Sequence, residues 1–318
     1  MKRFLLLILC TTLLITVFSG CSNTPTDVRI LNTHNSAAVA LAHMLEPDEN
    51  AKNNYISTVV NLPSRAQTLF INDECDVAVV PFETATALYH SKNPEIKLLA
   101  GISVGGFELA STKSIKDFSE LKNQTIYVTE RGTLMEHILK YAASLYNVNP
   151  FEEIKIEFAS DNIELEQMLK DNEATFALLS SAQASMLKAN NLNLTTYNLT
   201  DVLSKKLKKP SIINYCVVAT NKFIKENAKA VEVLIKDIES SINNSSDVSK
   251  TLSLAKKHGL ITDDFFDEDF LTSCKIDFIS GEEMKKKSMA YYELLGKIKA
   301  FSTGSSKLKD DFYYVIEK

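Results

Sequence analysis

Short apolar runs rich in β-branched residues alternate along most of the chain with longer stretches in which apolar residues recur every three or four positions. The first pattern predicts buried strands and the second predicts amphipathic helices. We expect strands at residues 28–31, 55–62, 77–80, 96–102, 125–128, 154–158, 175–179 and 212–219. We expect helices at residues 37–45, 64–72, 84–90, 133–146, 164–172, 224–242 and 281–299. Strands that alternate with helices favour an α/β fold with mainly parallel sheets flanked by helices.

The alternating pattern restarts near residue 125, which suggests an internal repeat. When the chain is shifted by about a hundred residues, segment 30–36 falls on 127–133 and segment 76–80 falls on 175–179. A similar offset found twice, in the same order, predicts two lobes of like construction. We place lobe 1 at residues 27–106 plus 208–318 and lobe 2 at residues 107–207.

The N-terminal segment has the layout of a secretory signal. Two basic residues at positions 2–3 precede an apolar run at 4–18, and two small residues then lead to Cys21. This end resembles a bacterial lipobox, in which the cysteine receives acyl chains after cleavage. The resemblance implies a signal peptide at residues 1–20, lipidation of Cys21, a tether at 21–27 and a protein anchored on the extracytoplasmic face of the cell membrane. The alternative is simple secretion with an unmodified cysteine.

Composition narrows the range of functions. The 318 residues are 45% hydrophobic and 24% charged, which excludes a disordered or disulfide-dense chain. A net charge of −5 without a basic stripe argues against a nucleic-acid partner. Cys75, Cys216 and Cys274 are an odd number without CxxC spacing, so we interpret them as buried small hydrophobic residues, with one disulfide plus a free thiol as the alternative.

Candidate binding residues follow the predicted strands. Open α/β sheets bind ligands at the carboxyl ends of their strands, so two facing lobes would place four loops around a shared cleft. The candidate ligand-binding residues are Thr33, His34, Asn35, Ser36, Phe82, Glu83, Thr84, Gly106, Phe107, Arg131, Gly132, Thr133, Ser180, Ser181 and Tyr215. The aromatic members suit stacking on a flat ligand, although such residues also serve as core.

Two charged candidates have matching positions in the two lobes. Arg131 offers a planar fork for a carboxylate, sulfonate or phosphate, and Glu83 would accept hydrogen bonds from an amine. Each is also an ordinary residue for the start of a helix.

Ser36 and Thr133 suit N-caps. The paired glycines in segment 103–107 suggest a hinge between the lobes, with an ordinary turn as the alternative.

Signatures of common enzymes are missing from the sequence. It contains no GxGxxG, GxxxxGK[ST], HExxH or GxSxG motif, and its five histidines are scattered. We therefore assign no catalytic residue, no cofactor and no metal.

Several segments resemble bacterial ABC-importer substrate-binding proteins of the group that handles thiamine-pyrimidine precursors, aliphatic sulfonates, taurine and nitrate. The segments are DVAVVP at 76–81 with the helix after it, the Gly-rich 103–107, the strand entry at 118–128 with Arg131-Gly132-Thr133, NYCVVAT at 214–220 and DDFY at 310–313. Together they cover nearly all of residues 28–315. The resemblance implies a two-lobed type II periplasmic-binding-protein fold.

The same resemblance implies a function. It suggests a monomeric lipoprotein that captures a small polar or anionic solute between its lobes and delivers it to an ABC permease. Asn123 stands where this family usually has Gly, and Ser180-Ser181 replaces a Trp-Glu-Pro-type loop, so the solute cannot be carried over. The alternatives are a same-fold enzyme (a lyase or a pyrimidine-precursor synthase) and a ligand sensor acting on a receptor.

Overall fold

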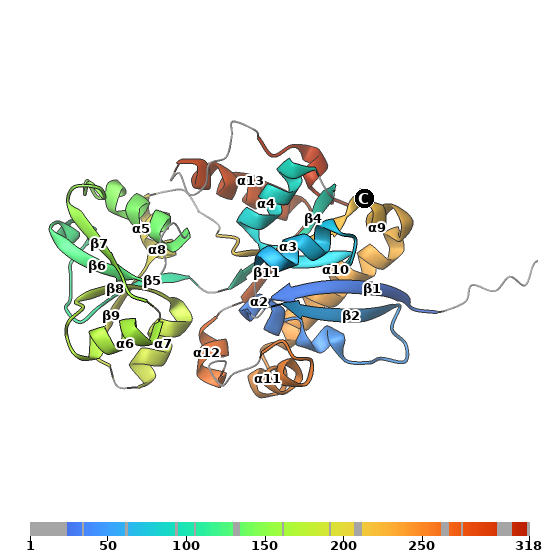
Figure 1. Cartoon of the computed structure of the whole chain (residues 1–318), viewed down its shortest axis with the longest axis horizontal. Helices are drawn as coiled ribbons and strands as arrows, with labels where there is room; N and C mark the ends of the chain where they lie inside the picture. The colour runs from blue at the N-terminus through green and yellow to red at the C-terminus, as the bar shows by residue number, and fades with distance from the viewer. Residues whose placement is uncertain are drawn as a thin grey trace, which may run out of the picture.

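The chain forms two α/β lobes that lie side by side (Figure 1). The computed structural model describes residues 24–33, 35–60, 63–92, 95–104, 106–129, 134–160, 162–190, 192–206, 212–261, 267–274, 276–297 and 307–316. The two-lobed α/β fold expected from the sequence is confirmed.

The first lobe is built on a six-stranded sheet with the order β11-β4-β10-β3-β1-β2. Its strands are β1 (Thr26–Thr33), β2 (Asn53–Val60), β3 (Val77–Pro81), β4 (Ile96–Val104), β10 (Tyr215–Thr220) and β11 (Ile276–Ser280). β1 pairs in parallel with β2 and β3, whereas β10 is antiparallel to β3 and β4, and β11 is antiparallel to β4. The sheet is therefore mixed, although β1 to β4 all point the same way.

The second lobe is built on a five-stranded sheet with the order β7-β6-β8-β5-β9. Its strands are β5 (Phe107–Ser111), β6 (Gln124–Val128), β7 (Ile154–Phe158), β8 (Phe176–Ser180) and β9 (Thr195–Asn198). β6 is parallel to β7 and β8, and β5 is antiparallel to β8 and β9. This sheet is likewise mixed, with only β5 pointing against the others.

Helices cover the faces of both sheets. In the first lobe they are α2 (Ser36–Val39), η2 (Ala42–Leu45), α3 (Pro63–Ile71), α4 (Phe82–Ser91), α9 (Asn221–Glu226), α10 (Ala228–Asn244), α11 (Val248–Lys257), α12 (Glu268–Ser273), α13 (Gly281–Lys297) and η4 (Asp310–Phe312). In the second they are η3 (Phe118–Leu121), α5 (Leu134–Leu145), α6 (Asn162–Lys170), α7 (Ser181–Ala189) and α8 (Leu199–Lys206). One expected helix is split into α2 and η2, and another into α9 and α10.

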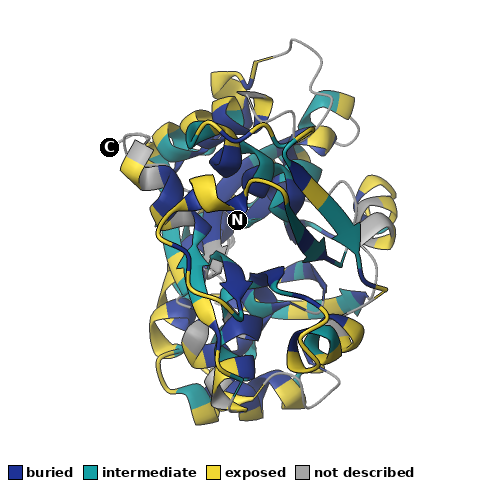
Figure 2. Cartoon of the chain, turned by 90° about the vertical axis from the view of Figure 1, so that its left-hand side faces the viewer, coloured by how far each residue is buried: buried dark blue, intermediate teal, exposed yellow. Residues whose placement is uncertain are grey.

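The central strands of the first sheet are buried on both faces, which explains their continuous apolar runs. One face packs on α10 and contains Val28, Ile30, Val77, Val79, Val217, Val231, Leu234 and Ile238. The other packs on α4 and α13 and contains Leu31, Ala78, Val80, Phe82, Leu88, Cys216, Val218, Met284 and Tyr291. Figure 2 shows buried residues along the strands and exposed residues on the outer helices. Cys75, Cys216 and Cys274 are free and buried, as expected.

The chain passes between the lobes at the end of β4. β4 pairs with β11 as far as Val104, whereas Gly106 bonds to Ser181 of the second lobe. The return follows α8. β1 begins at Thr26, so the last two residues of the expected tether pair with β2. The exact lobe boundaries stay predictions.

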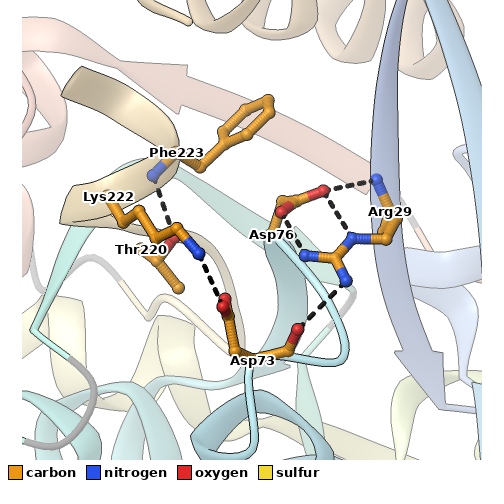
Figure 3. Close-up of polar contacts among 6 residues, drawn as sticks. All are labelled: Arg29, Asp73, Asp76, Thr220, Lys222 and Phe223. Atoms are coloured by element: carbon orange, nitrogen blue, oxygen red, sulfur yellow. Dashed lines mark hydrogen bonds and ion pairs between the residues drawn. The ribbon is translucent and has the colours of Figure 1, made fainter. Parts of the chain in front are cut away.

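A cluster of ion pairs joins β1, the start of β3 and α9 (Figure 3). Asp76 accepts from the backbone N of Arg29 at 3.0 Å, from its Nε at 3.0 Å and from its Nη2 at 2.7 Å. Arg29 also donates to the backbone O of Asp73, whose carboxylate pairs with Lys222 at 2.7 Å. The cluster lies at the amino end of β3, away from the strand ends that carry the candidate loops.

Candidate functional site

The carboxyl ends of the two sheets face each other. β4 leaves the first sheet at its carboxyl end and continues directly into β5, so the connection joins that end to the edge where β5 begins. Because β6, β7, β8 and β9 run opposite to β5, their carboxyl ends share that edge. This is the arrangement in which open α/β sheets place their ligand loops.

The loop after β1 is held by Asn35. This residue is the N-cap of α2, with an extended backbone and a side-chain Oδ1 that accepts from Ala38 N at 2.9 Å. Its Nδ2 donates to the O and Oγ1 of Thr33. The expected cap, Ser36, is instead the first helical residue, and its Oγ lies 3.4 Å from Cys274 Sγ at the end of α12. The polar side chains of Thr33 and Asn35 are thus engaged within the loop.

Glu83 lies in the first turn of α4, next to the start of β10. Pro81 pairs with Tyr215, and Phe82 N donates to Asn214 O at 3.1 Å, which fixes the start of the helix against that strand. Phe82 is fully buried, while Glu83 and Thr84 keep some exposure. Burial raises the pKa of Glu83, and its Oε1 is buried without a hydrogen-bond partner among the described residues.

Three further groups surround this carboxyl. Burial, together with the charge of Glu83, raises the pKa of Tyr215 to about 12 and holds the pKa values of Cys216 and Tyr291 well above their usual ranges. The Tyr291 ring lies 5.2 Å from the Phe82 ring, and its hydroxyl has no hydrogen-bond partner among the described residues. Sequence reasoning missed Tyr291 because it lies on α13, where an aromatic residue in a helical pattern indicates core.

The second-lobe loop after β8 is closed by its own hydrogen bonds. Ser180 forms a capping box with Gln183. Ser181 Oγ donates to Glu108 at 2.8 Å and accepts from Gly106 N at 3.1 Å. Both serine hydroxyls are therefore already bonded inside the lobe, and their expected contact with a ligand stays a prediction.

A close approach explains the glycine of the crossing segment. A Cβ at Gly106 would lie 2.7 Å from Asn198 Nδ2, which itself donates to Glu108 at 2.9 Å. Ser181 N also donates to Gly106 O at 2.9 Å. Gly106 is thus bonded to residues of the second lobe, and Phe107 beside it packs against the core.

Asn123 stands where the family that this sequence resembles usually has Gly, and the backbone conformation at this position explains why either residue fits. Its φ is +61°, in the left-handed region that Gly adopts freely and Asn tolerates better than most residues. The departure therefore preserves the turn before β6.

The structure brings the described candidates together in two groups. Thr33, Asn35, Ser36, Phe82, Glu83, Thr84 and Tyr215 lie at the carboxyl end of the first sheet, and Gly106, Phe107, Ser180 and Ser181 lie at the facing edge of the second. His34, Arg131, Gly132, Thr133 and Cys21 lie outside the described residues.

The described residues also form a surface cavity away from these strand ends, but they form neither a metal site nor a membrane-spanning helix. A surface cavity of about 860 Å³ is lined by the C-terminal half of α5 and the segment that precedes β7, including Lys140 and Phe151. Within the described ranges, no three His, Cys, Asp or Glu side chains gather as a metal site would require. No described helix combines the length and apolarity needed to cross a bilayer.

Comparison with solved structures supports the fold. An ABC transporter from Parabacteroides distasonis has a TM-score of 0.72 at 20% identity, covering 92% of this chain and 99% of its own. The periplasmic aliphatic sulphonate binding protein SsuA from Escherichia coli has a TM-score of 0.65 at 10% identity, with coverages of 90% and 94%. The periplasmic nitrate-binding protein NrtA from Synechocystis PCC 6803 has a TM-score of 0.56 at 9% identity, with coverages of 88% and 83%.

These structures share the fold that the sequence resemblance implied. At such identities the likeness concerns the fold alone. No protein-family model matches the chain, and no curated protein sequence matches it.

Proposed function

We propose that this protein is a solute-binding lipoprotein of an ABC importer, which captures a small polar or anionic solute between its lobes. The observation that carries the proposal is the pair of facing strand ends, with an unpartnered buried carboxyl oxygen on one of them. The names of the structures that share its fold, which include sulphonate- and nitrate-binding proteins, support the same function.

In this proposal the lobes close on the solute by bending between Val104 and Gly106. Glu83 and Arg131 hold opposite ends of the solute, because the two residues follow strands of different lobes. Binding shifts the population toward the closed form, and that form docks on the permease. No bond of the solute is made or broken, and the protein acts as a monomer.

The first test identifies the solute. Native mass spectrometry of the purified protein should reveal a co-purified small molecule, which calorimetry can then titrate into stripped protein. A charge-assisted hydrogen bond contributes about 1.5–3 kcal/mol, so Arg131→Ala should weaken binding by about 10- to 150-fold. Arg131→Lys should recover only part of that loss, because it keeps the charge without the planar fork. Wild-type affinity in both Arg131→Ala and Glu83→Gln would leave the two residues as ordinary helix-start charges.

The second test concerns anchoring on the extracytoplasmic face of the membrane. If Cys21 carries the acyl chains, Cys21→Ser should yield an unlipidated protein that is released or kept as a precursor. Detergent partitioning measures the difference, and unchanged partitioning of the variant would count against the anchor.

A further inference from the structure

Six buried side-chain polar atoms of the first lobe stand without hydrogen-bond partners among the described residues. Two of them, Oε1 of Glu83 on α4 and the hydroxyl oxygen of Tyr291 on α13, belong to residues of neighbouring elements at the candidate site. More than nine in ten buried polar groups in folded proteins have a partner, so two unpaired groups in one small region call for an explanation. A bound group that donates hydrogen bonds to both would supply one.

The packing of three elements brings these atoms to the same region. Phe82, which precedes Glu83, packs against Tyr291 with tilted rings whose centroids are 5.2 Å apart. The start of β10 also lies beside Glu83, because Tyr215 pairs with Pro81 and Cys216 pairs with Val80 at the end of β3. Glu83 as a whole keeps some exposure, so the region is at the boundary of the lobe rather than sealed inside it.

No described positive charge balances the carboxylate of Glu83. The groups that respond to its charge are Tyr215 and Cys216 on β10 and Tyr291 on α13, and none of these carries a positive charge. Burial is the main influence on the pKa of Glu83, which is raised, and no described cation opposes that shift. A carboxylate removed from water without a positive partner is unfavourable and requires either a proton or a cation.

We propose that the solute carries a protonated nitrogen, an ammonium or amidinium group, which binds between the Glu83 carboxylate and the Tyr291 hydroxyl. This inference rests on the proposed function and narrows its solute class. Such a group has several N–H donors, enough for both oxygen atoms, and the rings of Phe82, Tyr215 and Tyr291 favour a cation. Any anionic end of the solute then lies away from Glu83, toward the second lobe. Tyr291 becomes a second specificity residue beside Glu83.

Methylammonium is a suitable probe because it carries the proposed group and nothing else. The protein has 11 tyrosines, which can be labelled with ¹³C at Cζ and followed by NMR, with the Tyr291 signal assigned from Tyr291→Phe. A ligand of two heavy atoms reaches at best a Kd of roughly 6 mM, so saturation is expected over about 10–100 mM. The Tyr215 and Tyr291 signals should shift saturably with methylammonium chloride and not with sodium acetate at equal ionic strength.

Variants separate recognition from folding. Glu83→Gln should weaken methylammonium binding at least about 10-fold. Tyr291→Phe should weaken it about 2- to 10-fold, and in this variant binding is measured from the NMR signal of Tyr215. Removing an unpartnered buried hydroxyl should leave folding intact. Tyr313→Phe is the matched control, because Tyr313 is an equally buried tyrosine of the same hydrophobic cluster without Glu83 among its neighbouring charges, and it should leave affinity unchanged.

The outcomes distinguish this inference from the proposed function. Equal methylammonium affinity in wild type and Glu83→Gln, or no saturable shift in wild type, would overturn the inference. So would a co-purified solute that lacks a protonated nitrogen yet binds between the lobes, and that result would leave the proposed function standing. Saturable methylammonium binding by a protein that binds no solute with both lobes would support a cation site at Glu83 but overturn both solute capture and the solute class inferred from it.

Discussion

The bond network of Asp76 should be a principal source of stability for the first lobe (Figure 3). Asp76→Ala removes the acceptor of three N–H groups of Arg29, the backbone N, Nε and Nη2, at 3.0, 3.0 and 2.7 Å. These bonds tie the start of β3 to β1, which are neighbours in the sheet. Truncation leaves a guanidinium and a strand N–H without their anionic partner.

The exposure of the two side chains sets the size of the effect. The Asp76 side chain is 15% exposed, whereas that of Arg29 is 41% exposed, so water replaces part of what the guanidinium loses. The backbone bond to a charged acceptor contributes about 1.5–3 kcal/mol. We discount the two guanidinium bonds together to about 0.5–1 kcal/mol because the head group is partly solvated. Asp76→Ala should therefore lower the free energy of unfolding by about 2–4 kcal/mol.

Urea unfolding followed by circular dichroism measures this loss, and Lys222→Met is the matched control because Asp73 itself has a φ of +60° that Ala would adopt only with strain. The Asp73 pair with Lys222 is exposed on both sides, at 53% and 61%, so its loss should cost less than about 1 kcal/mol. Arg29→Met in a double-mutant cycle with Asp76→Ala isolates the pair energy. Solute affinity should not change, because the cluster is at the opposite end of the sheet. If Asp76→Ala costs no more than Lys222→Met, the reasoning from geometry and burial is wrong.

Three further predictions concern the candidate site. Burial raises the folded pKa of Glu83, so the folded state holds its proton more tightly than the unfolded state, and this stabilisation is lost as pH rises through the folded pKa. Glu83→Gln should therefore gain stability relative to wild type between pH 4 and pH 8 in urea titrations, and a difference independent of pH would contradict this. Gly106→Ala should cost about 1–3 kcal/mol in thermal unfolding through its clash with Asn198, and strictly additive losses with Asn198→Ala would refute that cause. Asn35→Ala should lower stability by about 1 kcal/mol through loss of the α2 cap, whereas an unchanged melting temperature would show that the cap is dispensable.

Sequence-based prediction worked best for strands that are buried on both faces of a sheet, because such strands have continuous apolar runs. Strand 77–80 is continuous and apolar because helices cover both of its sides, and the bounds expected for strand 154–158 match β7. β5, β9 and β11 were not predicted, because they are short and contain polar residues. Such strands are stabilised by pairing with their neighbours in the sheet rather than by an apolar run of their own. The antiparallel pairs that make both sheets mixed come from these long-range pairings.

The site was predictable only as far as it follows from strand ends. Glu83 was placed correctly after its strand, since any residue there lies at the carboxyl edge of the sheet. Nothing local to Tyr291 indicates that α13 places this residue where the charge of Glu83 affects it. The hydrogen bonds of Ser181 to Glu108 and Gly106 were equally out of reach of the sequence, because they depend on the nonlocal pairing of β5 with β8.

The two lobes differ in how many hydrogen-bonding groups near their described strand ends lack a partner, and this difference affects binding. In the second lobe Ser180 and Ser181 are already bonded, so the start of α7 is rigid before any solute arrives. In the first lobe Glu83 and Tyr291 keep unpaired buried atoms, which gain the most from a ligand because they have lost water without replacement. Among the described residues, the first lobe therefore offers a solute more unpaired buried atoms than the α7 loop does. Under the proposed function, the second lobe can close over the solute without reorganising the α7 loop, which lowers the conformational entropy that closure must lose.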